Sequence, residues 1–84
     1  MPARTRSGWL PARVYCALDR AFGVHHPLRT GHTVEGGRVR VSLTAGYDRA
    51  EIGHAWVASP AEAVTWARGR LARLAAIEAD AVGV

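Results

Sequence analysis

The sequence predicts a small α+β domain with the element order α-β-β-β-α, in which two helices cover one face of a three-stranded antiparallel sheet. Three observations predict this fold: an amphipathic stretch near the N-terminus, a Gly-Gly turn between two alternating runs, and a capping box before a second amphipathic stretch. A chain of 84 residues forms one domain with a single modest core. We expect residues 1–7 to be a flexible basic arm and residues 8–82 to form the domain.

The first helix is predicted to begin after Ser7, which can cap it, so that Pro11 falls in its first turn. At 100° per residue, one side of this helix is apolar and is expected to face the core. The apolar side contains Leu10, Val14, Tyr15, Ala17, Leu18, Ala21 and Phe22. Gly23 suits the left-handed position that ends a helix. Residues 24–31 have no period and are predicted to be a loop.

The pair Gly36-Gly37 predicts a two-residue hairpin turn, because such turns need positive φ angles. Closing this turn brings residues 32–35 opposite residues 38–41. The expected pairs are Glu35 with Arg38, Val34 with Val39, Thr33 with Arg40 and His32 with Val41. One face of the hairpin is then apolar and includes a partly buried His32, whereas the other carries an opposite-charge pair and a further arginine.

The third strand is predicted over residues 52–58, with His54 and Trp56 on one face, and its alternation leaves open which face is buried. Ser59-Pro60-Ala61-Glu62 is a capping box with proline at the first helical position. The last helix is expected to run to about Asp80. Its predicted buried stripe consists of Val64, Ala67, Leu71, Leu74 and Ala75, with Trp66 and Ile77 on one flank.

The predicted element order resembles that of the double-stranded-RNA-binding domain over nearly the whole chain, and the resemblance implies that topology. The family carries a lysine-rich motif at the start of its last helix, where this chain has Ser59-Pro60-Ala61-Glu62-Ala63-Val64. Glu62 would repel the phosphates that those lysines bind. Gly36-Gly37 is also too short to reach a minor groove as the corresponding loop of the family does. We therefore transfer no binding residues from the family.

The formal net charge is +4, and all 11 basic residues are arginine, as GC-rich coding favours. The arginines are concentrated in residues 1–40, which predicts one basic face, and basic faces favour polyanions. Two arginines of the second strand, two residues apart, would lie about 6.7 Å from each other, a spacing similar to that of backbone phosphates. We expect non-specific nucleic-acid binding through an arginine face made of Arg4, Arg6, Arg13, Arg20, Arg38 and Arg40.

An alternative function is protein interaction or self-association as a homodimer. Trp9, Trp56 and Trp66 are many tryptophans for so short a chain, and tryptophan with arginine is typical of interface hot spots. The outer face of the second strand discriminates between the two functions. Continuity of this face with the arginines of the first helix would favour nucleic acid, whereas exposed aromatic neighbours would favour a protein partner.

Neither catalysis nor metal binding is expected. Cys16 is predicted on the polar side of the first helix near two arginines, and cations make a thiol more reactive. Cys16 and His54 resemble the Cys–His pairing of transglutaminase-like peptidases, but the Asp of that family is missing. His25, His26 and His32 lack the paired spacing of a zinc site. We therefore expect no enzyme activity, no metal and no cofactor.

Cysteine usage and hydropathy predict a cytoplasmic location. The one cysteine cannot form an internal disulfide, which fits a reducing compartment. The basic N-terminus is not followed by a signal-peptide core, and no apolar run approaches the ~20 residues of a membrane span. We expect no membrane partner.

Overall fold

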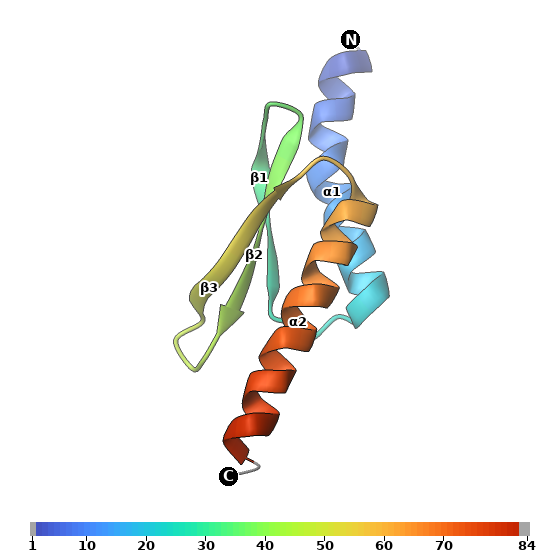
Figure 1. Ribbon diagram of the computed structural model, residues 1–84. Helices are drawn as coiled ribbons and strands as arrows, with labels where there is room; N and C mark the ends of the chain where they lie inside the picture. Colours follow the sequence, from blue (N-terminus) through green and yellow to red (C-terminus); the bar gives the residue numbers. More distant parts are fainter. Residues whose placement is uncertain (1, 83–84) are drawn as a thin grey trace.

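The computed structural model describes the backbone of residues 2–82 and the side chains of residues 9–80. The elements are α1 (Pro2–Phe22), β1 (Leu28–Glu35), β2 (Arg38–Ala45), β3 (Ala50–Val57) and α2 (Pro60–Val82). The three strands form one antiparallel sheet in the order β1-β2-β3. Both helices lie on the same face of this sheet (Figure 1). The predicted fold class and element order are confirmed.

The core lies between the sheet and the two helices and contains only small and medium-sized apolar side chains. From α1, Val14 and Leu18 point inward one helical turn apart, as predicted. Among the described side chains of α2, the two buried residues are Ala63 and Ala67, whose small size allows that helix to approach the sheet closely. The buried apolar residues are Val14, Leu18, Leu28, Val39, Val41, Leu43, Val57, Ala63 and Ala67.

Helix α1 begins at Pro2 and not after Ser7, so the predicted cap is wrong. Proline suits the first helical position, because the N–H that it lacks has no partner there. Pro11 consequently lies inside the helix, where it donates no backbone hydrogen bond. The predicted end is confirmed: Gly23 has a φ of 85°, and its N–H donates to the Asp19 carbonyl oxygen at 2.8 Å.

Strand β1 begins at Leu28, four residues before the predicted start at His32, and it contains a bulge. The pairs next to the Gly-Gly turn are as predicted, but Thr30 and not His32 lies opposite Val41. Gly31, His32 and Thr33 therefore bulge out beside Arg40, and His32 is exposed instead of partly buried. The bulge shifts the register so that Leu28 lies buried opposite Leu43. A register extended from the turn without a bulge does not contain this pair.

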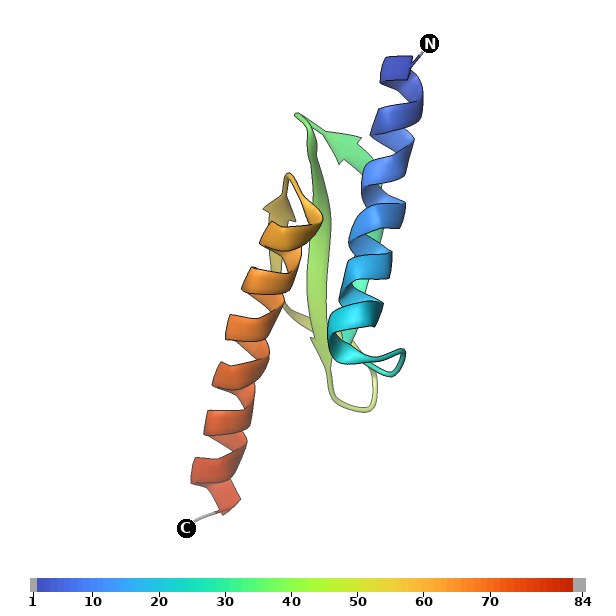
Figure 2. The same ribbon diagram turned by 90° about the vertical axis from the view of Figure 1, so that its right-hand side faces the viewer.

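Helix α2 begins with the predicted capping box. The Glu62 N–H donates to the Ser59 hydroxyl at 3.2 Å, and the Glu62 carboxylate accepts from the Ala58 N–H at 3.2 Å. The C-terminal half of the helix projects past the end of the sheet (Figure 2). Of the predicted buried stripe, Ala67 is fully buried and Ala75 is exposed. Ala75 is exposed because no strand lies beneath that part of the helix; Val64, Leu71 and Leu74 are half-buried.

Within the described residues, neither helix is long and apolar enough to cross a membrane.

Candidate interaction face of the sheet

The sheet face opposite the helices is built from alternate residues of the three strands. On β2, Val39, Val41 and Leu43 point into the core, so the residues between them point away from it. Residues directly opposite each other in antiparallel strands share a face, which places Trp56 beside Arg40 and His54 beside Ser42. We call this uncovered surface the open face. A register shift in β3 leaves Ile52 without a partner between Glu51 and Gly53. The paired residues of the open face are Arg29, Glu35, Arg38, Arg40, Ser42, Thr44, Glu51, His54 and Trp56.

The strand pairing shows which face of β3 is buried. Val57 is buried opposite Val39, and Ala55 is half-buried opposite Val41, so these two residues form the inner side of β3. Trp56 remains 40% exposed and His54 is exposed on the outer side. Small side chains on the inner side leave room for α2, and the bulky tryptophan therefore lies outside.

An ion-pair cluster occupies one half of the open face. The Arg40 guanidinium donates to Glu51 at 2.5 Å, and His54 Nδ1 lies 3.4 Å from the same carboxylate oxygen. The hydrogen bond from Arg40 is the main cause that lowers the pKa of Glu51 below its ordinary value, and the charges of Arg40 and His54 add to the effect. In the strand register, Arg40 and Glu51 lie on either side of the Ser42–His54 pair, so their ion pair passes over Ser42. Ser42 is only 7% exposed. The Arg40 side chain therefore extends along the face toward Glu51, with 38% of it still exposed.

The predicted arginine set does not lie on one surface. Arg38 and Arg40 are on the open face, whereas Arg13 and Arg20 are exposed on α1, on the helix side of the sheet. The side chains of the remaining two predicted residues, Arg4 and Arg6, lie outside the described part of the structure.

Sequence reasoning missed two further arginines near the open face. Arg29 lies opposite Ser42 on β1, and Arg49 is exposed in the turn that joins β2 to β3. The sequence predicts a loop at Arg29 because the bulge hides the strand period of β1. The signal that could have identified it is Leu28, an isolated apolar residue that the core requires.

The three tryptophans are on three separate surfaces. Trp56 is on the open face, Trp9 is 59% exposed on α1, and Trp66 is half-buried on α2 against the core. The guanidinium carbon of Arg70 lies 6.0 Å from the centre of the Trp66 ring, a cation–π distance. Of the three predicted interaction residues, Trp56 is therefore the one that the open face presents.

The cysteine and histidines are dispersed. Cys16 is exposed on α1, in a shallow groove with Arg13, Arg20 and Pro60, whereas His54 is on the opposite side of the sheet. The sheet therefore separates Cys16 from His54, the two residues that resemble a Cys–His pairing in the sequence. Among the described residues, no group of three or more His, Cys, Asp or Glu side chains is close enough to hold a metal ion.

No protein-family model matches this chain, and no curated protein or solved structure matches it either. The likeness to the double-stranded-RNA-binding domain is one of element order.

Proposed function

We propose that this protein is an interaction module that self-associates through the open face of its sheet. The observation that carries the proposal is the position of Trp56, which is exposed beside Arg40 on a sheet face that no helix covers. The outer face of β2 adjoins exposed aromatic side chains on β3 and is not continuous with the arginines of α1. That arrangement is the one that favours a protein partner over nucleic acid.

A second copy of the chain suits this face because the face carries both signs of charge. Arg29, Arg38 and Arg40 share it with Glu35 and Glu51. Across a two-fold axis, a residue of one copy meets a different residue of the other copy, and each such contact occurs twice. A face with both signs of charge can therefore be complementary to itself. Such sheets pack face to face at about 10 Å with their side chains interdigitated.

The size of the face predicts a weak, reversible dimer. Strands of 8 residues at about 3.3 Å per residue and three strands at about 4.8 Å make a face roughly 26 Å long and 14 Å wide. Because side chains make the surface uneven, two such faces bury more accessible area than their flat outline. The buried area then approaches the ~1,000 Å² of the smallest specific interfaces. We expect a dissociation constant on the order of 10–100 μM.

Sedimentation velocity over about 1 μM to 1 mM tests the proposal, because this range brackets the expected dissociation constant. The weight-average mass should rise from near the monomer mass toward the dimer mass across the range. Trp56→Ala should raise the dissociation constant at least tenfold, as hot-spot truncations do. Trp9→Ala is the matched control, since Trp9 is more exposed but lies on α1. A chain that stays monomeric at the highest concentration, or a loss as large in the control, overturns the proposal.

A second candidate function is non-specific binding of single-stranded nucleic acid. The observation that favours it is the presence of Arg29, Arg38 and Arg40 on the face that also exposes Trp56. Arginines that track phosphates and an aromatic ring that stacks on bases are the two elements of single-strand binding surfaces. Glu35 and Glu51 reduce the positive charge of the face, which favours self-association over nucleic-acid binding.

Fluorescence anisotropy with labelled single strands, duplex DNA and duplex RNA tests this candidate at about 50 and 200 mM salt. Three or more phosphate contacts should weaken binding clearly at the higher salt, because binding releases counterions. Arg38→Ala with Arg40→Ala should abolish this salt-dependent binding, whereas Arg13→Ala with Arg20→Ala, on the helix side, should leave most of it. Absence of binding at the lower salt eliminates nucleic acid as the partner.

A further inference from the structure

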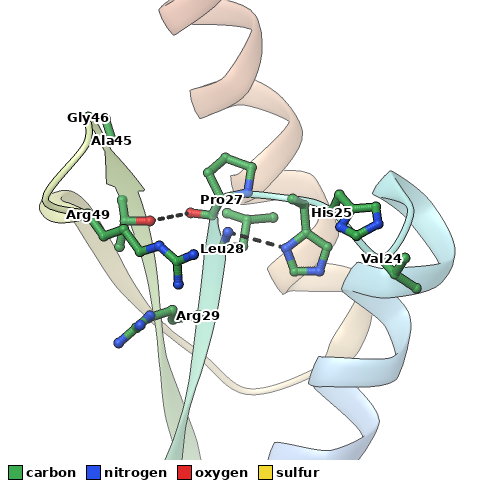
Figure 3. Close-up of a pocket in the computed structure, with 10 residues that line it drawn as sticks. Val24, His25, Pro27, Leu28, Arg29, Ala45, Gly46 and Arg49 are labelled. Atoms are coloured by element: carbon green, nitrogen blue, oxygen red, sulfur yellow. Dashed lines mark hydrogen bonds between the residues drawn. The ribbon is translucent and has the colours of Figure 1, made fainter.

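We propose that a hollow at one end of the sheet is a binding site for a phosphate group, held by Arg29 and Arg49. This inference rests on other observations than the proposed self-association, and the two share one residue, Arg29, which also lies on the open face. The hollow lies where the loop between α1 and β1 meets the turn between β2 and β3 (Figure 3). Its volume is about 560 Å³, within the range of small-ligand sites, and it is open to solvent. It is lined by Val24, His25, His26, Pro27, Leu28, Arg29, Thr44, Ala45, Gly46 and Arg49.

The lining of the hollow has positive charge and no acidic side chain. Two arginines and two histidines are among its ten residues, and Asp and Glu are absent from them. Three acidic residues are close to the lining in the chain or in the sheet register, and each has a partner. Asp19 binds His26 at 2.6 Å, Asp48 accepts a hydrogen bond from the Ala50 N–H at 3.3 Å, and Glu51, opposite Thr44, binds Arg40 at 2.5 Å. Within the described residues, no salt bridge involves either arginine. Neither guanidinium group therefore has an anionic partner among the residues that the structure describes.

The walls of the hollow are held in place by hydrogen bonds that join separate elements. The Pro27 carbonyl oxygen accepts from the Thr44 N–H at 2.8 Å and from the Thr44 hydroxyl at 3.2 Å. His26 links Asp19 of α1 to the first residue of β1, because its Nδ1 accepts from the Leu28 N–H at 3.2 Å. Two of these bonds are drawn in Figure 3. A site with fixed walls loses little freedom when a ligand binds.

The backbone of Arg49 is in a conformation that L-residues rarely adopt. Its φ is 56°, and it is the one non-glycine residue with positive φ in the described part of the chain. The turn is closed by a hydrogen bond from the Arg49 N–H to the Gly46 carbonyl oxygen at 3.2 Å. Glycine or asparagine would fit this position with less strain. Strained residues of this kind are concentrated at functional sites, and here the strained residue supplies one of the two free guanidinium groups.

The chemistry of the lining selects the ligand class. Guanidinium groups bind phosphate oxygens through paired, charge-assisted hydrogen bonds, and two of them can neutralise a dianion. Two sources of the phosphate group fit an open site of this size: a small phosphorylated compound, or the terminal phosphate of a nucleic-acid strand.

Amide-resolved NMR titration with inorganic pyrophosphate tests the site directly. We expect saturable shifts confined to residues 24–29 and 44–49, with a dissociation constant below about 1 mM. Arg49→Gly should weaken pyrophosphate binding at least tenfold without loss of folding, because glycine tolerates the positive φ. Arg29→Gln should weaken it similarly, whereas Arg20→Gln, on α1, should bind as the parent chain does.

A matched pair of oligonucleotides identifies the source of the phosphate. A strand with a 5′-phosphate that binds more tightly than its unphosphorylated twin, with the difference lost in Arg49→Gly, indicates a strand terminus. Equal affinity of the two strands together with pyrophosphate binding indicates a small phosphorylated compound. Absence of shifts at the hollow up to about 10 mM pyrophosphate overturns the proposal, as does equal pyrophosphate affinity of the parent chain and both hollow variants.

Discussion

Replacing His26 by alanine should lower the free energy of unfolding by about 2–3 kcal/mol, although His26 is in a loop. Its side chain is only 7% exposed and makes two hydrogen bonds that fasten the end of α1 to the start of β1. Since a backbone N–H can only donate, Nδ1 is the acceptor for Leu28, and the ring proton is on Nε2, which donates to Asp19. His26 therefore uses both ring nitrogens to hold the fold.

The magnitude follows from the groups that alanine leaves without partners. Leu28 is buried, and an unpaired N–H in such a place costs roughly 1–3 kcal/mol. The lost bond to Asp19 contributes less, about 0.5–1 kcal/mol, because that carboxylate is 25% exposed and water replaces the imidazole. In a domain of this size the sum corresponds to a fall in Tm of roughly 10–20 °C.

Urea denaturation followed by circular dichroism measures the change, and three variants make it specific. His25→Ala is the matched control, since His25 is the exposed neighbour and should change stability by less than about 0.5 kcal/mol. His26→Asn retains an acceptor for the Leu28 N–H but cannot reach Asp19, so it should lose only about 1 kcal/mol. Asp19→Asn still accepts from Nε2 and should be milder than His26→Ala. Equal stability of His26→Ala and His25→Ala would refute the reasoning.

Three further predictions concern the sheet and α2. Titration of the Glu51 carboxyl by NMR should show a pKa below the ordinary value that rises in Arg40→Gln, because the hydrogen bond from Arg40 is its main cause. Since the pKa of Glu51 is lowered in the folded state, the stabilisation from this pair is present at neutral pH and is lost as the pH falls through the folded pKa. An identical loss of stability at acid pH in the parent chain and in Arg40→Gln would contradict this. Gly69→Ala should raise stability by about 0.5–1 kcal/mol in thermal denaturation, because the position is helical and exposed with open space around it. Gly31→Ala should lower it by roughly 1 kcal/mol, since a Cβ there would lie 3.3 Å from the Arg40 carbonyl oxygen; a Tm at or above that of the parent would show that the bulge can relax.

Elements specified by local interactions could be predicted from the sequence. The capping box before α2 and Gly23 at the end of α1 act over three or four residues, and both are as predicted. The Gly36-Gly37 turn has positive φ at both residues, and the first two pairs next to it have the predicted register. In each of these cases the interacting groups are neighbours in the chain, so their spacing alone determines the geometry.

The candidate sites depend on which side of the sheet each residue occupies, and that was set by packing. The spacing of His54 and Trp56 predicts that they share one face of β3. Only the burial of Val57 against the helices shows that this face is the open face. The arginine set was divided between two surfaces for the same reason. Charge counted along the chain contains no information about which face of a sheet the helices cover.

By itself, the sequence determined the order of the elements, the end of α1 before Gly23, the start of α2 after Ser59, and the hairpin turn. The tertiary structure decided the bulge in β1, the exposure of Ala75, and the meeting of Arg29 with Arg49 at one hollow. The physical reason is range. Caps and turns are stabilised by hydrogen bonds between nearby residues, whereas register, burial and shared sites depend on which apolar side chains fill the core together. That choice involves residues far apart in the chain and is made only when the sheet and the helices pack.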